Sequence, residues 1–153
     1  MQKPTEIFGK WAEEGKDVGM EKGHATSVND MLDFALHERA NIGKNFSFLD
    51  LGCGNGWVTR NVSKNPLCAN AVGIDGAEQM IINAQKIGGQ VNYILADINS
   101  YTSTMRFDLI HSMEVIYYLD DPASKVKSLC EHWLEEQGRL IIGIDHYYEN
   151  LDS

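Results

Sequence analysis

The sequence lacks a long hydrophobic run. None of its apolar stretches approaches the roughly 20 residues that an α-helix needs to cross a bilayer. The opening residues, MQKPTEIFGKWAEEGK, contain no apolar segment of the kind found in a secretory signal. These absences argue against a membrane-embedded or secreted protein, and we expect no membrane partner.

Cysteine is scarce as well. Cys53, Cys68 and Cys130 are odd in number and widely spaced. Their spacing matches no metal-ligand pattern, so we expect no metal site. A reduced, cytoplasmic protein is the simplest interpretation.

Clusters of basic residues are also missing. The chain has 13 Lys and Arg against 22 Asp and Glu, which gives a formal net charge of −9. Because a protein that grips phosphate backbones normally carries a basic surface, we expect no nucleic acid partner. A small-molecule substrate is favoured instead, and the negative field would attract a cationic one. The charge can equally serve solubility alone, and this alternative stays open.

The N-terminal part of the sequence is polar and rich in glycine. Within residues 9–24, Gly15, Gly19 and Gly23 lie four apart, which indicates a loop or a mobile arm. We therefore expect residues 1–26 to form an N-terminal arm or lid.

The rest of the chain has the length and composition of one folded domain. A total of 153 residues with 43% hydrophobic content is enough to bury a sizeable core. Ser27 and Asp30 have the spacing of a capping box and open an amphipathic helix that ends near Gly43. We expect this domain to comprise residues 27–153.

Beyond that helix, apolar runs alternate with helical patterns. The predicted strands are residues 46–51, 69–75, 91–96, 107–112 and 139–144. The predicted helices are residues 57–64, 77–86 and 122–136, the last with Val126, Leu129, Cys130 and Trp133 facing inward. The alternation predicts an α/β fold with a doubly wound, mostly parallel sheet of five strands and helices on both faces.

A glycine-rich turn follows the first predicted strand, in the stretch FLDLGCGNGW at residues 48–57. Glycine permits positive φ and lets a ligand approach the main chain closely, and ligands of doubly wound sheets bind at the carboxyl ends of strands. The turn differs from the dinucleotide fingerprint, because Trp57 stands where its third glycine is expected. Asp50 would also repel a pyrophosphate and suits a ligand with a positive end.

These residues resemble the first motif of the class I S-adenosylmethionine-dependent methyltransferases. The similarity continues in GIDGAEQMIINAQ (73–85), LADI (95–98), FDLIHSMEVIYYLDD (107–121) and GRLIIG (138–143). It covers roughly residues 28–145, with the motifs in the family's order. The resemblance implies the strand order 3-2-1-4-5 and S-adenosylmethionine as cofactor, with S-adenosylhomocysteine as product.

The resemblance also implies the residues that bind the cofactor. Asp75 would bind the ribose hydroxyls, and Asp97 with the Ile98 main chain would bind the adenine. The stretch at 107–121 would line the methionine end and the methyl donor. The complete predicted set is Asp50, Gly52, Cys53, Gly54, Gly56, Asp75, Gly76, Met80, Asp97, Ile98, His111 and Ser112.

Several of these residues also have purely structural interpretations. Asp75 can cap the following helix, Asp97 can be a turn residue, and Met80 can simply pack in the core. His111 and His146 are the candidates for a general base, which is needed only if the acceptor arrives protonated. A histidine within a strand is more often structural, so a core role for His111 stays open.

The reaction implied by the resemblance is an in-line displacement that transfers a methyl group to a small-molecule acceptor. Tyr147 and Tyr148 suggest an aromatic cage for an amine, as a hypothesis. Two alternatives remain. One is a cofactor-binding domain without turnover of its own, either regulatory or a fragment, and the other is an NAD-dependent oxidoreductase with an irregular fingerprint.

One feature departs from the family pattern. The family sheet has seven strands, whereas this chain stops at Ser153, shortly after the fifth predicted strand. We therefore expect strands 6 and 7 to be missing and the domain to be truncated at its C-terminus. An exposed edge at the fifth strand would favour a homodimer.

Overall fold

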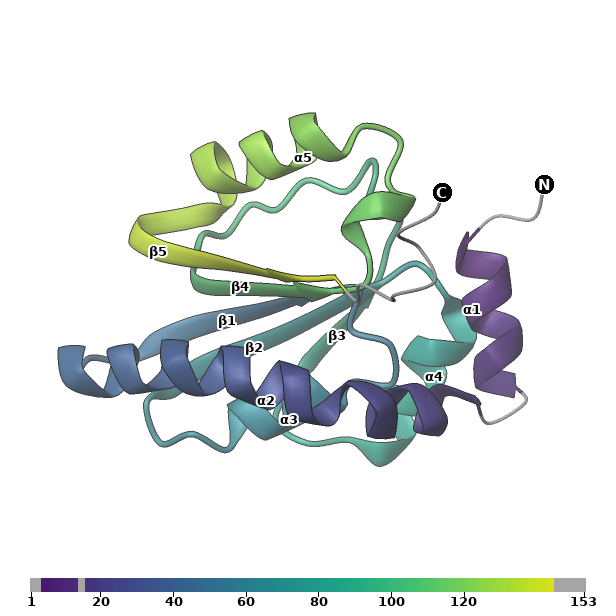
Figure 1. The fold of residues 1–153 in the computed structure, drawn as a ribbon, viewed down its shortest axis with the longest axis horizontal. Helices are drawn as coiled ribbons and strands as arrows, with labels where there is room; N and C mark the ends of the chain where they lie inside the picture. Colours follow the sequence, from purple (N-terminus) through teal and green to yellow (C-terminus); the bar gives the residue numbers. More distant parts are fainter. Residues whose placement is uncertain (1–3, 14–15, 145–153) are drawn as a thin grey trace, which may run out of the picture.

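The protein forms one parallel sheet with helices on both faces. The structure, a computed structural model, describes residues 4–13 and 16–144. Its sheet has five strands in the order β3-β2-β1-β4-β5, with parallel pairing throughout (Figure 1). The strands are β1 (Phe46–Leu51), β2 (Cys68–Asp75), β3 (Asn92–Leu95), β4 (Phe107–Met113) and β5 (Leu134–Gly143). The predicted fold class and strand order are confirmed.

The helices fall between these strands as the alternation predicted, with two more at the N-terminus. The α-helices are α1 (Pro4–Glu13), α2 (Lys16–Ile42), α3 (Trp57–Ser63), α4 (Glu78–Ile87) and α5 (Pro122–Ser128). A 3₁₀ turn, η1 (Ile116–Tyr118), precedes α5, and a π-helical turn, η2 (Leu129–Trp133), follows it.

Two hydrophobic clusters hold the helices against the sheet. On one face, Phe46, Phe48 and Leu109 pack with Val28 of α2 and Val58 of α3. On the other face, the alternate strand residues pack with the η2 side chains; this cluster includes Leu49, Leu51, Ile110, Leu129 and Trp133. Figure 1 shows α5 on one side of the sheet and α2 with α3 on the other. Burial on both faces explains why the strands read as nearly continuous apolar runs.

The N-terminal prediction of a loop across residues 9–24 is wrong. Helix α1 covers residues 4–13, and α2 begins at Lys16 and passes through Ser27 without a break. The glycines each cost helix stability, but tertiary contacts override such a local preference. Ala12 of α1, for example, is buried beside Ala77 and Met80. The predicted end of the helix near Gly43 is confirmed, since α2 ends at Ile42. The division into an arm at 1–26 and a domain at 27–153 stays a prediction.

The predicted helix at 122–136 is also partly wrong. It changes to a π-turn at Leu129 and ends at Trp133, and β5 begins at once. A π-turn inserts an extra residue, so it rotates the face that meets the sheet. Leu129 and Trp133 are accordingly buried, whereas Cys130 is exposed and not inward-facing as predicted. Strand β5 has an irregular start around Gln137, which has a φ of 62°.

The described sheet has β3 and β5 at its edges. Homodimer formation through the β5 edge stays a prediction. In the described part of the chain, no helix is both long and apolar enough to span a bilayer.

Candidate functional site

A cavity of about 770 Å³ opens at the carboxyl ends of the strands. It is lined by residues from the β1–α3 turn, the ends of β2 and β4, and the segments that follow β3 and β4. Its size falls within the usual range for small-molecule sites, roughly 300–1,000 Å³. Ten of the twelve predicted cofactor residues line it, the exceptions being Gly56 and Ser112.

The glycine turn after β1 lines this cavity with Gly52, Cys53 and Gly54. Gly52, Gly54 and Gly56 all have positive φ, at 82°, 56° and 86°. The amides of Gly52 and Cys53 both donate to the Ile74 carbonyl, at 2.7 and 2.9 Å, which ties the turn to β2. A Cβ at Gly52 would overlap the Val115 side chain, so glycine is required there for packing as well as for φ. A Cβ at Gly54 would find no protein atom closer than Met80 Sδ at 3.9 Å, because Gly54 faces the cavity.

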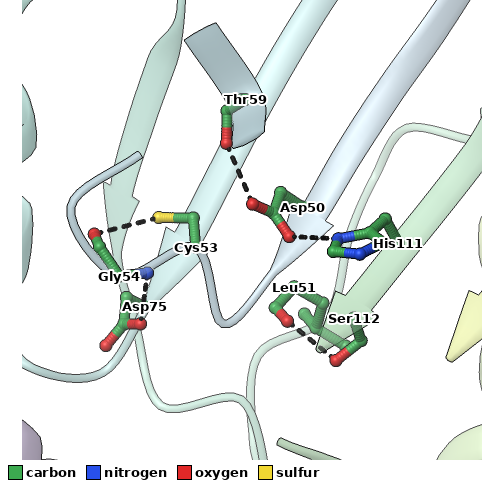
Figure 2. A network of polar contacts seen from close by, with 8 residues as sticks. All are labelled: Asp50, Leu51, Cys53, Gly54, Thr59, Asp75, His111 and Ser112. Atoms are coloured by element: carbon green, nitrogen blue, oxygen red, sulfur yellow. Dashed lines mark hydrogen bonds and ion pairs between the residues drawn. The ribbon is translucent and has the colours of Figure 1, made fainter. Parts of the chain in front are cut away.

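Asp75 closes the turn at the end of β2. Its Oδ2 accepts the Gly54 N–H at 2.9 Å (Figure 2). Its Oδ1 accepts the Ala77 N–H at 2.8 Å. Burial raises the pKa of this carboxyl, and the backbone hydrogen bonds oppose that rise. A carboxylate offers about four lone-pair positions, so acceptor capacity remains for a ligand in the cavity. The structural role at the start of α4 therefore coexists with the capacity to bind hydroxyls.

Asp50 and His111 form a buried polar pair under the cavity. His111 Nδ1 lies 2.9 Å from Asp50 Oδ1, and the Thr59 hydroxyl donates to Asp50 Oδ2 at 3.2 Å (Figure 2). The side chains of His111 and Asp50 are only 1% and 3% exposed. Nε2 of His111 is buried and has no hydrogen-bond partner among the described residues. In the neutral ring, donation from Nδ1 to Asp50 leaves the lone pair on Nε2.

Two further predicted residues, Ser112 and Cys53, make hydrogen-bonding contacts at the glycine turn and the strand before it. The Ser112 hydroxyl donates to the Leu51 carbonyl at 2.8 Å and is fully buried, so it braces β1 against β4. The Cys53 thiol lies 3.6 Å from the Gly54 carbonyl. Burial, with help from the charges of Asp75 and Asp50, raises the pKa of Cys53 well above its ordinary value. This thiol stays protonated and is not a nucleophile at neutral pH.

The far wall of the cavity holds Asp97, Ile98 and Met80. The Asp97 carboxylate accepts the Asn99 N–H at 2.9 Å, which is the turn role expected as its alternative, and the residue is exposed at the cavity edge. Met80 is 2% exposed and packs with Ala77, yet it also lines the cavity. Asp97 and Met80 thus each have a structural contact within the protein and also line the cavity.

A further wall of the cavity follows β4, within the stretch 107–121 that the resemblance placed beside the methionine end of the cofactor. Glu114, Val115, Tyr118, Leu119 and Asp120 line the cavity, and Thr5 joins them from α1. The signal for this wall was the position of the VIYYLDD stretch directly after a strand end, a place where ligand contacts collect in such sheets. His146, Tyr147 and Tyr148 lie outside the described residues, so the predictions for them stay predictions.

Comparison with known protein families gives a match over most of this fold. Residues 49–142 match a family described as "Methyltransferase domain". This segment runs from within β1 to the penultimate residue of β5 and includes the glycine turn, Asp75, Asp97 and His111.

Curated relatives carry methyltransferase names. The chain is 27% identical to a probable (S)-tetrahydroprotoberberine N-methyltransferase 2 of Papaver bracteatum, over 98% of this chain and 46% of that protein. It is 33% identical to a malonyl-[acyl-carrier protein] O-methyltransferase of Halalkalibacterium halodurans, over 70% of this chain and 43% of that protein. The chain therefore spans less than half the length of these two relatives.

A solved structure shares the fold. It is a complex between the Haloferax volcanii Trm112 methyltransferase activator and a methyltransferase termed putative, with a TM-score of 0.75 and 24% identity. The match covers 99% of this chain and 64% of that one. At this identity the likeness concerns the fold.

Proposed function

The chain belongs to the class I S-adenosylmethionine-dependent methyltransferases, whose domain it matches over residues 49–142, and we propose that it transfers a methyl group to a small-molecule acceptor. The cofactor of this family is S-adenosylmethionine, and the product left behind is S-adenosylhomocysteine. We further propose that the cavity at the carboxyl ends of β1, β2 and β4 is where this cofactor binds.

The observation that carries the proposal is the position of Asp75. Its carboxylate ends β2 at the cavity, and its two hydrogen bonds to backbone amides leave lone pairs for the two hydroxyls of a ribose. The cavity is also large enough for a molecule of nucleoside size. The residues present therefore fit the cofactor.

Other residues have proposed roles on either side of Asp75. Asp97 and the Ile98 main chain would meet the adenine edge, with Met80 beneath the ring. The Gly54 position leaves room for the ligand beside the main chain, since no protein atom stands within 3.9 Å of a Cβ built there. Asp50 and His111 lie toward the β4 side, where the amino-acid end and the transferred methyl group belong.

The cofactor supplies an activated methyl group on a sulfonium, so the protein has no bond to activate by metal or covalent means. Its residues have to hold donor and acceptor in line and keep water out. The paired Asp50 and His111 present Nε2 as the candidate proton acceptor if the acceptor arrives protonated. Asp50 is then a positioning residue that fixes the ring.

The names of the relatives do not identify the methyl acceptor of this chain. One is named as an N-methyltransferase and another as an O-methyltransferase, so family membership leaves the acceptor atom open. We propose a soluble small molecule and a reducing, cytoplasmic location, which Cys53, Cys68 and Cys130, free within the described residues, support.

A thermal melt with S-adenosylmethionine, S-adenosylhomocysteine and NAD in parallel tests the proposal. At about 100 times the dissociation constant, a bound ligand stabilises the folded state by roughly 2.7 kcal/mol. For a domain of this size the midpoint should rise by roughly 5–10 °C with the two adenosyl ligands. A shift with NAD alone would overturn the cofactor assignment.

A matched pair of variants ties the shift to the cavity. Asp75→Asn keeps the shape but weakens acceptance from ribose hydroxyls, and the midpoint shift should fall to less than about half. Glu136→Gln removes an exposed charge on β5 outside the cavity and should leave the shift unchanged. Methyl transfer from labelled donor then separates an active enzyme from a binding domain without turnover.

A further inference from the structure

The charge on the cavity walls has one sign. Among the described residues, the cavity lining includes six carboxylates, from Asp50, Asp75, Glu78, Asp97, Glu114 and Asp120, and neither Lys nor Arg. The proposed cofactor carries one net positive charge. Its proposed contacts account for Asp75 and Asp97, and Asp50 is paired with His111. The carboxylates of Glu114 and Asp120 lie on the other wall, after β4, and the cofactor assignment does not use them.

The wall after β4 holds its carboxylate in a fixed place. Glu114 has a φ of 59°, and its N–H donates to the Gly143 carbonyl at 2.9 Å, which ties the end of β4 to β5. The Tyr117 hydroxyl donates to Glu114 Oε2. Further along, the Asp120 N–H donates to Asn99 Oδ1 at 3.0 Å, so this segment is anchored at both ends.

Aromatic rings stand beside this carboxylate. Tyr118 lines the cavity, and its ring centroid lies 4.5 Å from that of Tyr117, which supports it from outside the cavity lining. Tyr118 and Tyr117 are 42% and 46% exposed, respectively. Burial and the hydrogen bond to Glu114 raise the pKa of Tyr117, so the phenol stays neutral. Ring faces next to a carboxylate attract ammonium groups by cation–π and Coulomb forces.

A second and independent feature of the same cavity also favours a ligand with N–H groups. His111 lines the cavity, is 1% exposed, and its Nε2 has no partner among the described residues. A buried acceptor without a partner costs free energy, and a ligand N–H would remove that cost. A carboxylate ligand has no hydrogen to give, whereas an amine does.

From these observations we infer that the acceptor is a small amine, recognised as an ammonium ion by Glu114 and the Tyr117–Tyr118 pair. The inference rests on the proposed function. An ammonium nitrogen must lose one proton before its lone pair can form the new N–C bond, and Nε2 of His111 accepts that proton. The C–S bonding pair of the donor returns to sulfur, so charge and electrons balance.

The carboxylates on the cavity walls also predict which classes of acceptor should bind weakly. An acceptor with a free carboxylate would meet Glu114 and Asp120 with like charge and would leave Nε2 of His111 without a donor. A neutral alcohol would satisfy Nε2 but would gain nothing from the carboxylates. The expected order of affinity is therefore amine, then alcohol, then carboxylate.

Ligand-observed NMR titrations on the full chain, saturated with S-adenosylhomocysteine, test this order with three probes of similar size: benzylamine, benzyl alcohol and benzoate. Benzylamine should bind about fivefold more tightly than benzyl alcohol, as one added ion pair allows, and benzoate should bind most weakly. Glu114→Gln should reduce the preference for benzylamine to about twofold or less. Glu136→Gln, which removes an equal charge outside the cavity, should leave the preference intact.

The outcomes separate the two proposals. If S-adenosylhomocysteine itself does not bind, the proposed function fails and takes the amine inference with it. If it binds but benzyl alcohol or benzoate matches benzylamine, only the amine inference is overturned. Equal effects of Glu114→Gln and Glu136→Gln would likewise overturn it, because the preference would then come from the general field of the protein.

Discussion

At the scale of single residues, the Asp50 and His111 pair is the most tightly constrained part of the site. Both side chains are almost fully buried, and Asp50 also accepts a hydrogen bond from Thr59. Breaking a buried pair by removing one partner is costly because the remaining group loses its compensation. The pair should therefore be essential for stability as well as for any proton transfer.

Replacing His111 tests that cost. His111→Phe leaves the Asp50 carboxylate with Thr59 alone and should lower the free energy of unfolding by about 3 kcal/mol. Thr59→Val removes one donor to the same carboxylate at nearly constant volume and should cost about 1–2 kcal/mol. Urea unfolding of both variants measures the difference. Equal costs would mean that His111 contributes no more to Asp50 than a single hydroxyl does.

The three cysteines should differ sharply in reactivity. Cys130 is exposed, Cys68 is half-buried, and Cys53 is buried with a pKa raised well above the ordinary value of 9.0. Iodoacetamide at pH 8 should label Cys130 first, Cys68 slowly and Cys53 only after unfolding, because only a thiolate reacts. Mass spectrometry of tryptic peptides gives the order. Fast labelling of Cys53 in the folded protein would show that the turn opens readily.

The raised pKa of Cys53 also sets the sign of a stability effect. Below pH 9.0 the thiol is protonated in both the folded and unfolded states, so it does not change the balance. Above pH 9.0 the unfolded thiol ionises while the folded one does not, so stability falls as the pH rises toward the higher folded value. Cys53→Ala should show a smaller loss of stability over that alkaline range than the unmodified chain does.

At the scale of elements, the glycine turn requires glycine for two reasons, the positive φ and the lack of space for a side chain. Substitutions can separate these two effects. Gly52→Ala places a methyl group at positive φ and against Val115, and it should cost about 3 kcal/mol of stability. Adding Val115→Ala makes room for the methyl group and should recover about 1 kcal/mol as coupling between the two sites. Gly54→Ala carries only the φ penalty, about 1–2 kcal/mol, because its Cβ faces the cavity.

The variant that costs less stability, Gly54→Ala, should cost more ligand affinity. The Gly54→Ala methyl group stands in the cavity and should weaken binding of S-adenosylhomocysteine by about tenfold, which is roughly 1.4 kcal/mol. The double variant Gly52→Ala with Val115→Ala should bind closer to normally, since its added methyl group takes the space that the Val115 side chain vacates. Calorimetric titration measures both affinities. If Gly54→Ala bound normally, the ligand would not approach the main chain there.

The elements themselves were predictable to different degrees from the sequence. Both ends of strand β1 were predicted correctly, because a buried apolar run is followed directly by glycines, which have positive φ in the structure. Helix α1 and the first half of α2 were missed, since Gly19 and Gly23 break the local pattern and tertiary contacts decide the outcome. The π-turn at Leu129 was missed because no local signal distinguishes it from a regular turn.

At the scale of the whole molecule, the site exists only where distant segments meet. Residues at strand ends, such as Asp50 and Asp75, could be predicted because parallel strands bring their carboxyl ends to one edge of the sheet. The Asp50–His111 contact joins positions 61 apart, and no spacing rule predicts that these two side chains should pair. Thr5 reaches the cavity from α1, which the sequence did not show to be a helix.

The summed charge of the molecule leads to a prediction on the cofactor itself. S-adenosylmethionine carries one positive charge more than S-adenosylhomocysteine, and the two are otherwise nearly the same in shape. With a net charge of −9 and six carboxylates around the cavity, the field should favour the charged donor over the product. This difference would help the product to leave after each transfer.

Salt separates this field from direct contacts. Raising the ionic strength from about 0.1 M to about 1 M shortens the Debye length from about 10 Å to about 3 Å. The affinity for S-adenosylmethionine should fall by about threefold, whereas that for S-adenosylhomocysteine, which has no net charge, should change by less than about 1.5-fold. Calorimetric titrations of both ligands at the two salt concentrations measure the effect. If both affinities fell equally, the carboxylates would act only through contacts that the two ligands share, and the acidic character of the chain would contribute nothing to the choice between donor and product.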